Sequence, residues 1–172
     1  TGAELVIDAA AEPERILALC GEGPLVRVVT THRHRDHWQA LAEVVERTGA
    51  ATVAHPDDAP AIEVATTEPV TGGDRVVVGS VELEVIHLVG HTPGGIALLY
   101  DDPTGSPHLW TGDSLFPGGP GRTTSTERFT SLMGDLEEKV FARLPDETWV
   151  YPGHGADTTL GTERPRLSEY RD

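Results

Sequence analysis

Four side chains of the kinds that bind metal ions lie within six consecutive residues of this chain, in the pattern His32-x-His34-x-Asp36-His37. Residues two apart on an extended segment project to the same side, so His32 and His34 can bind one ion together. A turn after them can direct Asp36 and His37 toward a second ion. Neutral imidazole and carboxylate are ligands that borderline divalent metals such as zinc accept.

The flanking sequence places this cluster between a strand and a helix. Residues 25–29 are apolar except for Arg27 and form a strand candidate, and residues 39–48 have the pattern of a helix that ends at Gly49. A solvated, histidine-rich loop is the alternative interpretation. A shuffled chain of the same composition would show this spacing only roughly once in a thousand arrangements. The spacing therefore favours metal binding.

Three further turns each combine glycine with one potential ligand at the end of an expected strand. They are Gly90-His91-Thr92-Pro93-Gly94, Thr111-Gly112-Asp113-Ser114 and Pro152-Gly153-His154-Gly155. A single histidine in such a turn is more often structural than functional. Strand ends at one edge of a sheet lie close together, and ligands bind there in many folds. Four such turns in one chain therefore predict one shared site.

Short apolar and β-branched runs alternate with helix-like stretches along the chain. The expected strands are residues 5–7, 25–29, 51–54, 75–78, 81–88, 96–100, 108–111 and 148–151. The expected helices are residues 14–20, 39–48 and 127–144, with a helical turn at 56–59. The alternation predicts the α/β class, and a length of 172 residues predicts a single domain, 1–172.

Composition and charge exclude several classes of partner and location. The chain has 13 basic and 28 acidic side chains and a net charge of -15. Such a surface repels phosphate backbones, so we expect no nucleic-acid partner. No apolar run approaches membrane-spanning length, and no secretory signal is visible at the start. Cys20 is the only cysteine, which excludes an internal disulfide and fits a reducing, cytoplasmic location; we expect a buried structural thiol.

The ordered motifs resemble those of the metallo-β-lactamase superfamily, and especially the short single-domain members of its glyoxalase II-like (hydroxyacylglutathione hydrolase-like) branch. Val6-Ile7-Asp8 also resembles the family's early strand. The resemblance implies a four-layer αββα sandwich with a binuclear metal site at one edge of its two sheets. It assigns seven ligands: His32, His34 and His91 to the first ion, Asp36, His37 and His154 to the second, and Asp113 as the bridge. The presence of Asp113 argues against a true β-lactamase, whose family pattern lacks that carboxylate.

The chain departs from the family pattern in three places. The family usually has an N-terminal hairpin before its Ile-Asp strand, whereas little precedes Ile7 and Asp8 here. The helical C-terminal domain of glyoxalase II, which supplies much of the glutathione site, is absent. Leu88 and Val89 precede the His91 turn where relatives often have Thr-Pro. The second departure puts glutathione specificity in doubt and favours the short relatives.

The resemblance implies a metal-dependent hydrolase that acts on a small-molecule thioester, such as a hydroxyacyl-thiol, or on a related ester. Two divalent ions, zinc first with iron or manganese as alternatives, would lower the pKa of a bound water and make hydroxide available at neutral pH. Asp36 and Asp113 are the expected catalytic carboxylates, and Phe116 and Arg122 the expected substrate contacts. An iron-dependent persulfide dioxygenase, a lactonase and a non-catalytic metal-binding protein are the alternatives.

Four other polar side chains have expected roles outside the ligand set. We expect Asp8 to support the ligand loop, since histidine ligands usually need an outer hydrogen-bond partner. His87 is expected to pack or to support the ligands, and His55 is expected to be structural. His108 is expected to lie in a polar, solvated turn.

Overall fold

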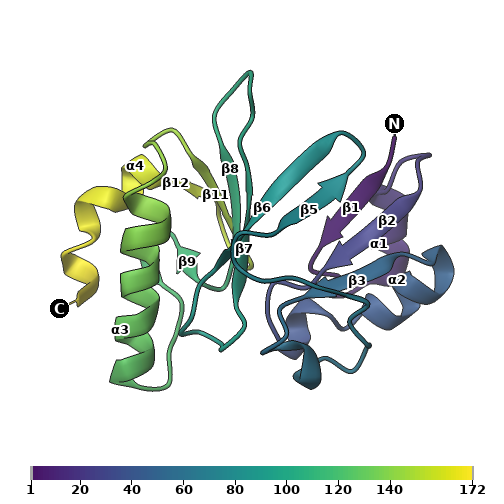
Figure 1. Cartoon of the computed structure of the whole chain (residues 1–172), viewed down its shortest axis with the longest axis horizontal. Helices are drawn as coiled ribbons and strands as arrows, with labels where there is room; N and C mark the ends of the chain where they lie inside the picture. Colours follow the sequence, from purple (N-terminus) through teal and green to yellow (C-terminus); the bar gives the residue numbers. More distant parts are fainter. Residues whose placement is uncertain (1, 172) are drawn as a thin grey trace.

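Two β-sheets lie face to face in the computed structural model of this chain, which describes residues 2–171 (Figure 1). The first sheet is parallel and has the order β1-β2-β3-β4, formed by Glu4–Ile7, Leu25–Val29, Ala51–Ala54 and Glu68–Pro69. The second sheet has the order β12-β11-β8-β7-β6-β5, formed by Thr158–Thr159, Trp149–Pro152, His108–Gly112, Ile96–Tyr100, Val81–His87 and Arg75–Val78. A separate hairpin pairs β9 (Leu115–Phe116) with β10 (Gly119–Pro120).

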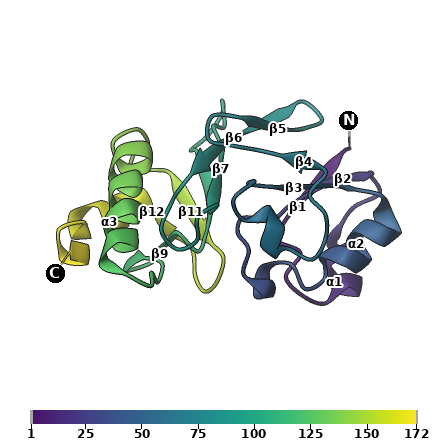
Figure 2. The same ribbon diagram turned by 60° about the horizontal axis from the view of Figure 1, so that its bottom comes forward.

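Helices cover the outer side of each sheet (Figures 1 and 2). The first sheet is covered by α1 (Pro13–Leu19) and α2 (Leu41–Thr48). The second is covered by α3 (Thr126–Asp135), the π-helical segment η3 (Leu136–Phe141) and α4 (Leu160–Glu163). The other short helices are η1 (Arg35–His37), η2 (Ala59–Ala61), η4 (Arg164–Arg166) and η5 (Glu169–Arg171). Within residues 2–171, none of these helices is long and apolar enough to span a bilayer.

Neighbouring residues of the central strands point to opposite faces, and each face is buried in a different core. In β2, Val28 packs beneath α1 and α2, whereas Val29 packs between the two sheets. In β7, Leu99 packs beneath α3, whereas Leu98 packs between the sheets. Strands buried on both faces have mostly apolar sequences, which explains residues 25–29, where Arg27 is the one charged residue. The predicted α/β class and αββα sandwich are therefore confirmed.

Most expected elements occur within one or two residues of their predicted bounds, and the differences have local causes. The expected helix 127–144 begins at Thr126 because the Ser125 hydroxyl caps it by accepting the Arg128 N–H. The helix becomes π-helical at Leu136 and ends at Phe141. The turn expected at 56–59 lies at Ala59–Ala61. Strands of two residues, β4, β9, β10 and β12, were not predicted, since so short a segment shows no alternation of side chains.

The expectation of a buried thiol at Cys20 was wrong. Cys20 is the C-cap residue of α1 rather than part of its apolar face, and its side chain is only partly buried. The thiol packs at the margin of the core beneath α1 and α2. Burial and the neighbouring Glu4 carboxylate raise the pKa of Cys20 above its usual value, which keeps the thiol protonated and poorly nucleophilic.

Candidate metal centre

Strand direction brings the four predicted turns to one edge of the sandwich. Strands β6, β8 and β11 run in the same direction, because β7 is antiparallel to both of its neighbours and β11 is parallel to β8. Their C-terminal ends carry His91, Asp113 and His154 in the segments that follow. The segment after β2 passes through η1 and carries the four ligand candidates of the first motif. The convergence expected from the sequence is therefore present.

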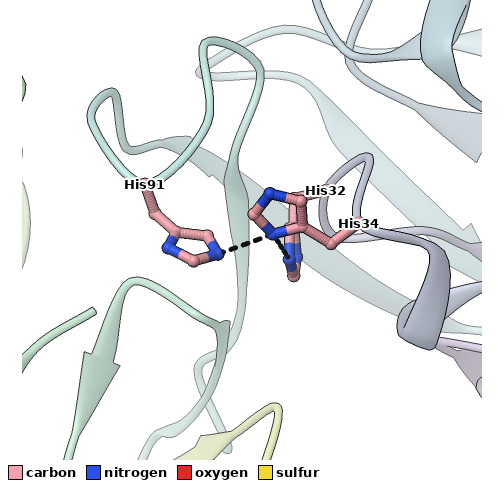
Figure 3. Close-up of side chains that lie close together, drawn as sticks. All are labelled: His32, His34 and His91. Atoms are coloured by element: carbon pink, nitrogen blue, oxygen red, sulfur yellow. Dashed lines mark hydrogen bonds between the residues drawn. The ribbon is translucent and has the colours of Figure 1, made fainter. Parts of the chain in front are cut away.

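The first group of side chains is His32, His34 and His91, whose rings meet nearly at right angles (Figure 3). Nδ1 of His34 lies 3.1 Å from Nε2 of His32 and 2.9 Å from Nε2 of His91. Two nitrogens bound to one zinc ion at about 2.0–2.1 Å in a tetrahedron would be about 3.3 Å apart. The group is therefore close to the size that one such ion requires.

The outer nitrogens of His32 and His91 have partners that aim the inner ones at the centre of the group. Nδ1 of His91 donates to the carbonyl oxygen of Arg122 at 2.7 Å, so its Nε2 carries the lone pair. Nδ1 of His32 lies 3.1 Å from the Thr31 hydroxyl. Burial, with help from the neighbouring His37, lowers the pKa of His32 to about 2, so this imidazole is neutral. Neutral rings with inward lone pairs suit a metal ion.

The second group is Asp36, His37 and His154. Nε2 of His154 lies 3.1 Å from Nε2 of His37 and 3.1 Å from a carboxylate oxygen of Asp36. His37 is buried, whereas the side chains of Asp36 and His154 are 53% and 54% exposed. This group therefore lies at the solvent side of the centre, where a small molecule can reach it.

Asp113 lies between the two groups. One of its oxygens is 3.5 Å from Nε2 of His91 and 3.8 Å from Nε2 of His154. The other oxygen is 3.3 Å from Nε2 of His37, is buried, and has no hydrogen-bond partner among the described residues. A buried carboxylate oxygen without a partner is costly, and a cation at this point would satisfy it.

The electrostatics of His37 also fit a cation. Burial opposes charge on this ring, but its contacts with the carboxylates of Asp113 and Asp8 outweigh burial and raise the pKa of His37 to about 10. Burial would raise the pKa of Asp113, yet the surrounding histidines hold it below its usual value. The site therefore demands positive charge, and a divalent ion can supply it in place of the proton on His37.

Glycines let the backbone approach these side chains closely. A Cβ at Gly153 would collide with the Asp113 carboxylate and with the His37 ring. A Cβ at Gly121 would collide with the Asp113 carbonyl oxygen, and Gly112 has φ +49° and would press on Thr31. These glycines are therefore required because a larger residue would collide with the ligand candidates and their neighbours, and not only because the chain turns there.

The two expected substrate contacts lie in the segment after β8. Phe116 is a partly buried residue of β9, and the Arg122 side chain is exposed. Arg122 also contributes its carbonyl oxygen to His91, which the sequence did not indicate. Whether either side chain contacts a substrate stays a prediction.

The remaining histidines have structural partners. The rings of His55 and His87 stack with centroids 3.9 Å apart and an angle of 24° between their planes. Nearly parallel rings do not aim their nitrogens at a common point, so this pair differs from the first group, although Asp57 lies nearby. His108 begins β8, where the expected strand 108–111 places it, but the expectation of a polar, solvated turn there was wrong, because its half-buried ring has Nδ1 2.8 Å from the Tyr151 hydroxyl.

Two acids outside the ligand set support the centre. The Asp8 carboxylate bonds with His37 and with the hydroxyl and N–H of Thr31, as the sequence led us to expect for Asp8. Asp58, which sequence reasoning missed, is buried and accepts hydrogen bonds from the N–H groups of Arg33 and Gly94. The available signal was its position just after β3, at the same edge of the fold, but the adjacent Asp57 gave the same signal.

An apolar groove of about 840 Å³ adjoins the second group. It runs along β1, which is an edge strand of the first sheet, and the facing wall comes from the second sheet. That wall includes Leu83, Tyr100, Trp110 and Tyr151. Asp36, His37 and His154 lie at one end, so the exposed side of the centre opens onto an apolar surface.

Known proteins share this sequence pattern and fold. A hydroxyacylglutathione hydrolase of Polaromonas sp. (strain JS666) is 36% identical over 156 residues, which cover 90% of this chain and 58% of that protein. The ETHE1 crystal structure from Myxococcus xanthus is 32% identical, covers 98% of this chain and 76% of that one, and has a TM-score of 0.84. TTHA1623, crystallised in a di-iron-bound form, is 31% identical, with 92% and 85% coverage and a TM-score of 0.75.

The chain spans somewhat more than half the length of most of the curated hydroxyacylglutathione hydrolases that it matches. The family model of the metallo-beta-lactamase superfamily matches residues 1–154, which include all seven ligand candidates. This agreement of sequence, fold and site geometry shows that the chain belongs to the metallo-beta-lactamase superfamily.

Proposed function

We propose that this protein is a metal-dependent hydrolase that cleaves a thioester, and that His32, His34, His91, Asp36, His37, His154 and Asp113 hold two divalent ions. The position of Asp113 supports this most directly. Its carboxylate faces both histidine groups, with one oxygen 3.3 Å from His37 and the other 3.5 Å from His91. A carboxylate in that position can bridge two ions. Similarity to hydroxyacylglutathione hydrolases supports the thioester class.

Two ions in this centre would supply a water of lowered pKa and a Lewis acid for the substrate carbonyl. The protein contributes the arrangement around them. Burial keeps His32 neutral, and Asp8 orients His37. Asp36 is half exposed beside His154, so the second group lies where a substrate can reach it. The partly buried Asp113 keeps its negative charge, because the surrounding histidines hold its pKa below the usual value, and it faces both groups.

A thioester suits such a site because a thiolate leaves without a proton donor. The centre has no need of a serine or cysteine nucleophile, and the partly buried Cys20 has a raised pKa. We propose that the acyl part lies toward Phe116 and that Arg122 pairs with a carboxylate of the substrate. We propose zinc as the metal, with iron or manganese as alternatives, and a cytoplasmic location for the enzyme.

One alternative has an observation in its favour. The likeness to the ETHE1 structure, at 32% identity over 98% of this chain, fits an iron-dependent persulfide dioxygenase. Such a reaction needs one iron held by two histidines and a carboxylate, and that set is available here. Lactone hydrolysis is chemically close to thioester hydrolysis and would use the same centre.

Metal and substrate measurements on one preparation separate these functions. The protein is purified without added metal and without acid or chelator, because acid and chelators strip bound ions. Its metal content is then measured. It is then loaded with zinc or with iron and assayed on thioesters, lactones and glutathione persulfide. We expect two metals per chain and thioester hydrolysis. At most one metal per chain after loading with excess metal would contradict the two-ion centre. Oxygen uptake on the persulfide without thioesterase activity would establish the alternative.

A further inference from the structure

Asp58 joins the two loops that carry the first group of histidines. Its side chain is buried and follows β3. Oδ2 accepts the N–H of Arg33 at 3.0 Å, and Oδ1 accepts the N–H of Gly94 at 2.9 Å. Arg33 lies between His32 and His34, and Gly94 lies three residues after His91. One carboxylate therefore spans two segments that are distant in sequence, and each of them carries ligands for the same ion.

The packing around this carboxylate leaves little freedom. A Cβ at Gly94 would lie 2.7 Å from the Asp58 nitrogen and 2.9 Å from its side chain, so only glycine allows this approach. The Arg33 peptide is held from the other side as well, because its carbonyl oxygen accepts the Trp38 indole N–H at 2.9 Å. The N–H and the carbonyl oxygen of Arg33 are thus both hydrogen-bonded, which fixes the backbone between His32 and His34.

We propose that Asp58 is a positioning residue for the first metal ion, which holds the His32–His34 loop and the His91 loop at the separation where their three nitrogens converge. Loss of either hydrogen bond would release one loop and spread the 2.9 Å and 3.1 Å contacts between the rings. The second group does not depend on this carboxylate, since His37 is oriented by Asp8. This inference rests on the proposed metal ligation but not on the reaction that follows.

The test uses Asp58→Asn, which keeps the size of the side chain but replaces one acceptor oxygen with a donor NH₂ group. That group would face one of the two N–H donors, so one loop is released. The variant is placed in two backgrounds: His154→Ala, which leaves the first group intact, and His91→Ala, which leaves the second intact. Cobalt(II) affinity is measured by chelator competition, and the visible absorption of bound cobalt reports the ligand geometry.

We expect Asp58→Asn to weaken cobalt binding about 10–100-fold in the His154→Ala background, with an altered absorption spectrum, as for other groups that orient ligands. Binding in the His91→Ala background should not change. Gly94→Ala should reproduce this selectivity by pushing on the same carboxylate. Glu163→Gln is the matched control, because Glu163 is another buried acid but bonds with Thr158, Tyr170 and Gly118.

Four outcomes would overturn the proposal. Equal weakening of cobalt binding in both backgrounds would show that Asp58 stabilises the whole protein and not the first group in particular. A lower melting temperature with unchanged cobalt affinity, which is the result expected of Glu163→Gln, would show the same. An unchanged affinity and spectrum in the His154→Ala background would exclude the role directly. If neither background binds cobalt before Asp58 is changed, the proposed metal ligation itself fails and the inference fails with it.

Discussion

The Asp8 carboxylate accepts a hydrogen bond from Nδ1 of His37 at 2.8 Å, so His37 presents its Nε2 to the other ligands. The same oxygen accepts the Thr31 hydroxyl at 2.8 Å. Because that hydroxyl proton is used, the contact between Thr31 and Nδ1 of His32 requires the imidazole to donate. Asp8 therefore sets the tautomer of one ligand in each group. It lies just after β1 with φ +58°, a conformation that aspartate tolerates better than most residues.

Asp8→Asn should weaken the binding of both metal ions about 10–100-fold, which is the usual effect of removing the outer partner of a histidine ligand. The side-chain NH₂ of asparagine would face the Thr31 hydroxyl and Nδ1 of His37, which are themselves donors. His32 and His37 would then lose their fixed tautomers. The measurement is metal affinity by competition with a chelator. Thr31→Ser keeps the hydroxyl and should bind normally; equal affinities of wild type and Asp8→Asn would contradict the assigned role.

Asp113→Ala should lower the content of both metals together and reduce turnover at least about 100-fold, since a ligand contributes more than an outer partner. The far-ultraviolet circular dichroism should stay that of a folded chain. Cys20→Ala is the control and should keep full metal and full turnover. A fully metallated and folded Cys20→Ala protein without activity would disprove the proposed metal-dependent hydrolysis, since it would show that the thiol takes part.

The residues themselves predicted the α/β class and the convergence of the four turns, because both follow from short-range rules, whereas the αββα sandwich was predicted from the family resemblance. Strands that are mostly apolar, such as residues 25–29 apart from Arg27, are buried on two faces, and Gly-rich turns at strand ends place one side chain each. Asp58 was missed because its role depends on two N–H groups, of Arg33 and Gly94, that only the folded chain brings to it. His108 was misjudged because its contact with Tyr151 joins two strands 43 residues apart.

Gly153→Ala should disrupt metal binding more than folding. The added methyl group would collide with the Asp113 carboxylate and the His37 ring, which belong to the centre. Overpacking of this kind costs about 1–3 kcal/mol of stability, so the variant should still fold. Metal stoichiometry and melting temperature measured on the same sample separate the two effects. Gly134→Ala is the matched control, because a Cβ there meets no atom within 4 Å; identical metal binding by both variants would refute the assigned packing.

Glu163→Gln should make the protein less stable at neutral pH, with a smaller deficit in acid. Burial alone would raise the pKa of Glu163, but hydrogen bonds from Thr158, Tyr170 and Gly118 outweigh it and hold that pKa below 4.5. The charged form is therefore favoured by folding. Its contribution is fully present above pH 4.5 and is lost as the pH falls through the lower value of the folded protein.

The expected deficit at neutral pH is about 1–3 kcal/mol in the free energy of unfolding, the cost of weakening hydrogen bonds to a buried charge. Urea denaturation of both proteins from pH 7 to below pH 4 measures it. The two stability curves should approach each other at the acid end. Curves that stay parallel over the whole range would show that Glu163 contributes no pH-dependent stability.

The last prediction concerns the thiol carrier of the proposed substrate. The glyoxalase II-like motifs favour a hydroxyacyl thioester. The solvent side of the centre, where Asp36 and His154 are half exposed, opens onto the apolar groove between β1 and the second sheet. We expect hydrolysis of small 2-hydroxyacyl thioesters with loose demands on the thiol.

The measurement compares kcat/KM for lactoyl-glutathione with kcat/KM for the same acyl group on simpler thiols. Similar values would fit loose recognition of the carrier. Arg122→Ala should then lower kcat/KM only slightly, and only for lactoyl-glutathione, because the carboxylates of that substrate lie on the glutathione and not on the lactoyl group. A drop of several hundredfold on removing the glutathione part would correspond to at least about 3 kcal/mol of specific carrier recognition. That result would contradict the loose-carrier prediction but not the proposed hydrolase activity, because the same metal centre cleaves the same bond in both substrates.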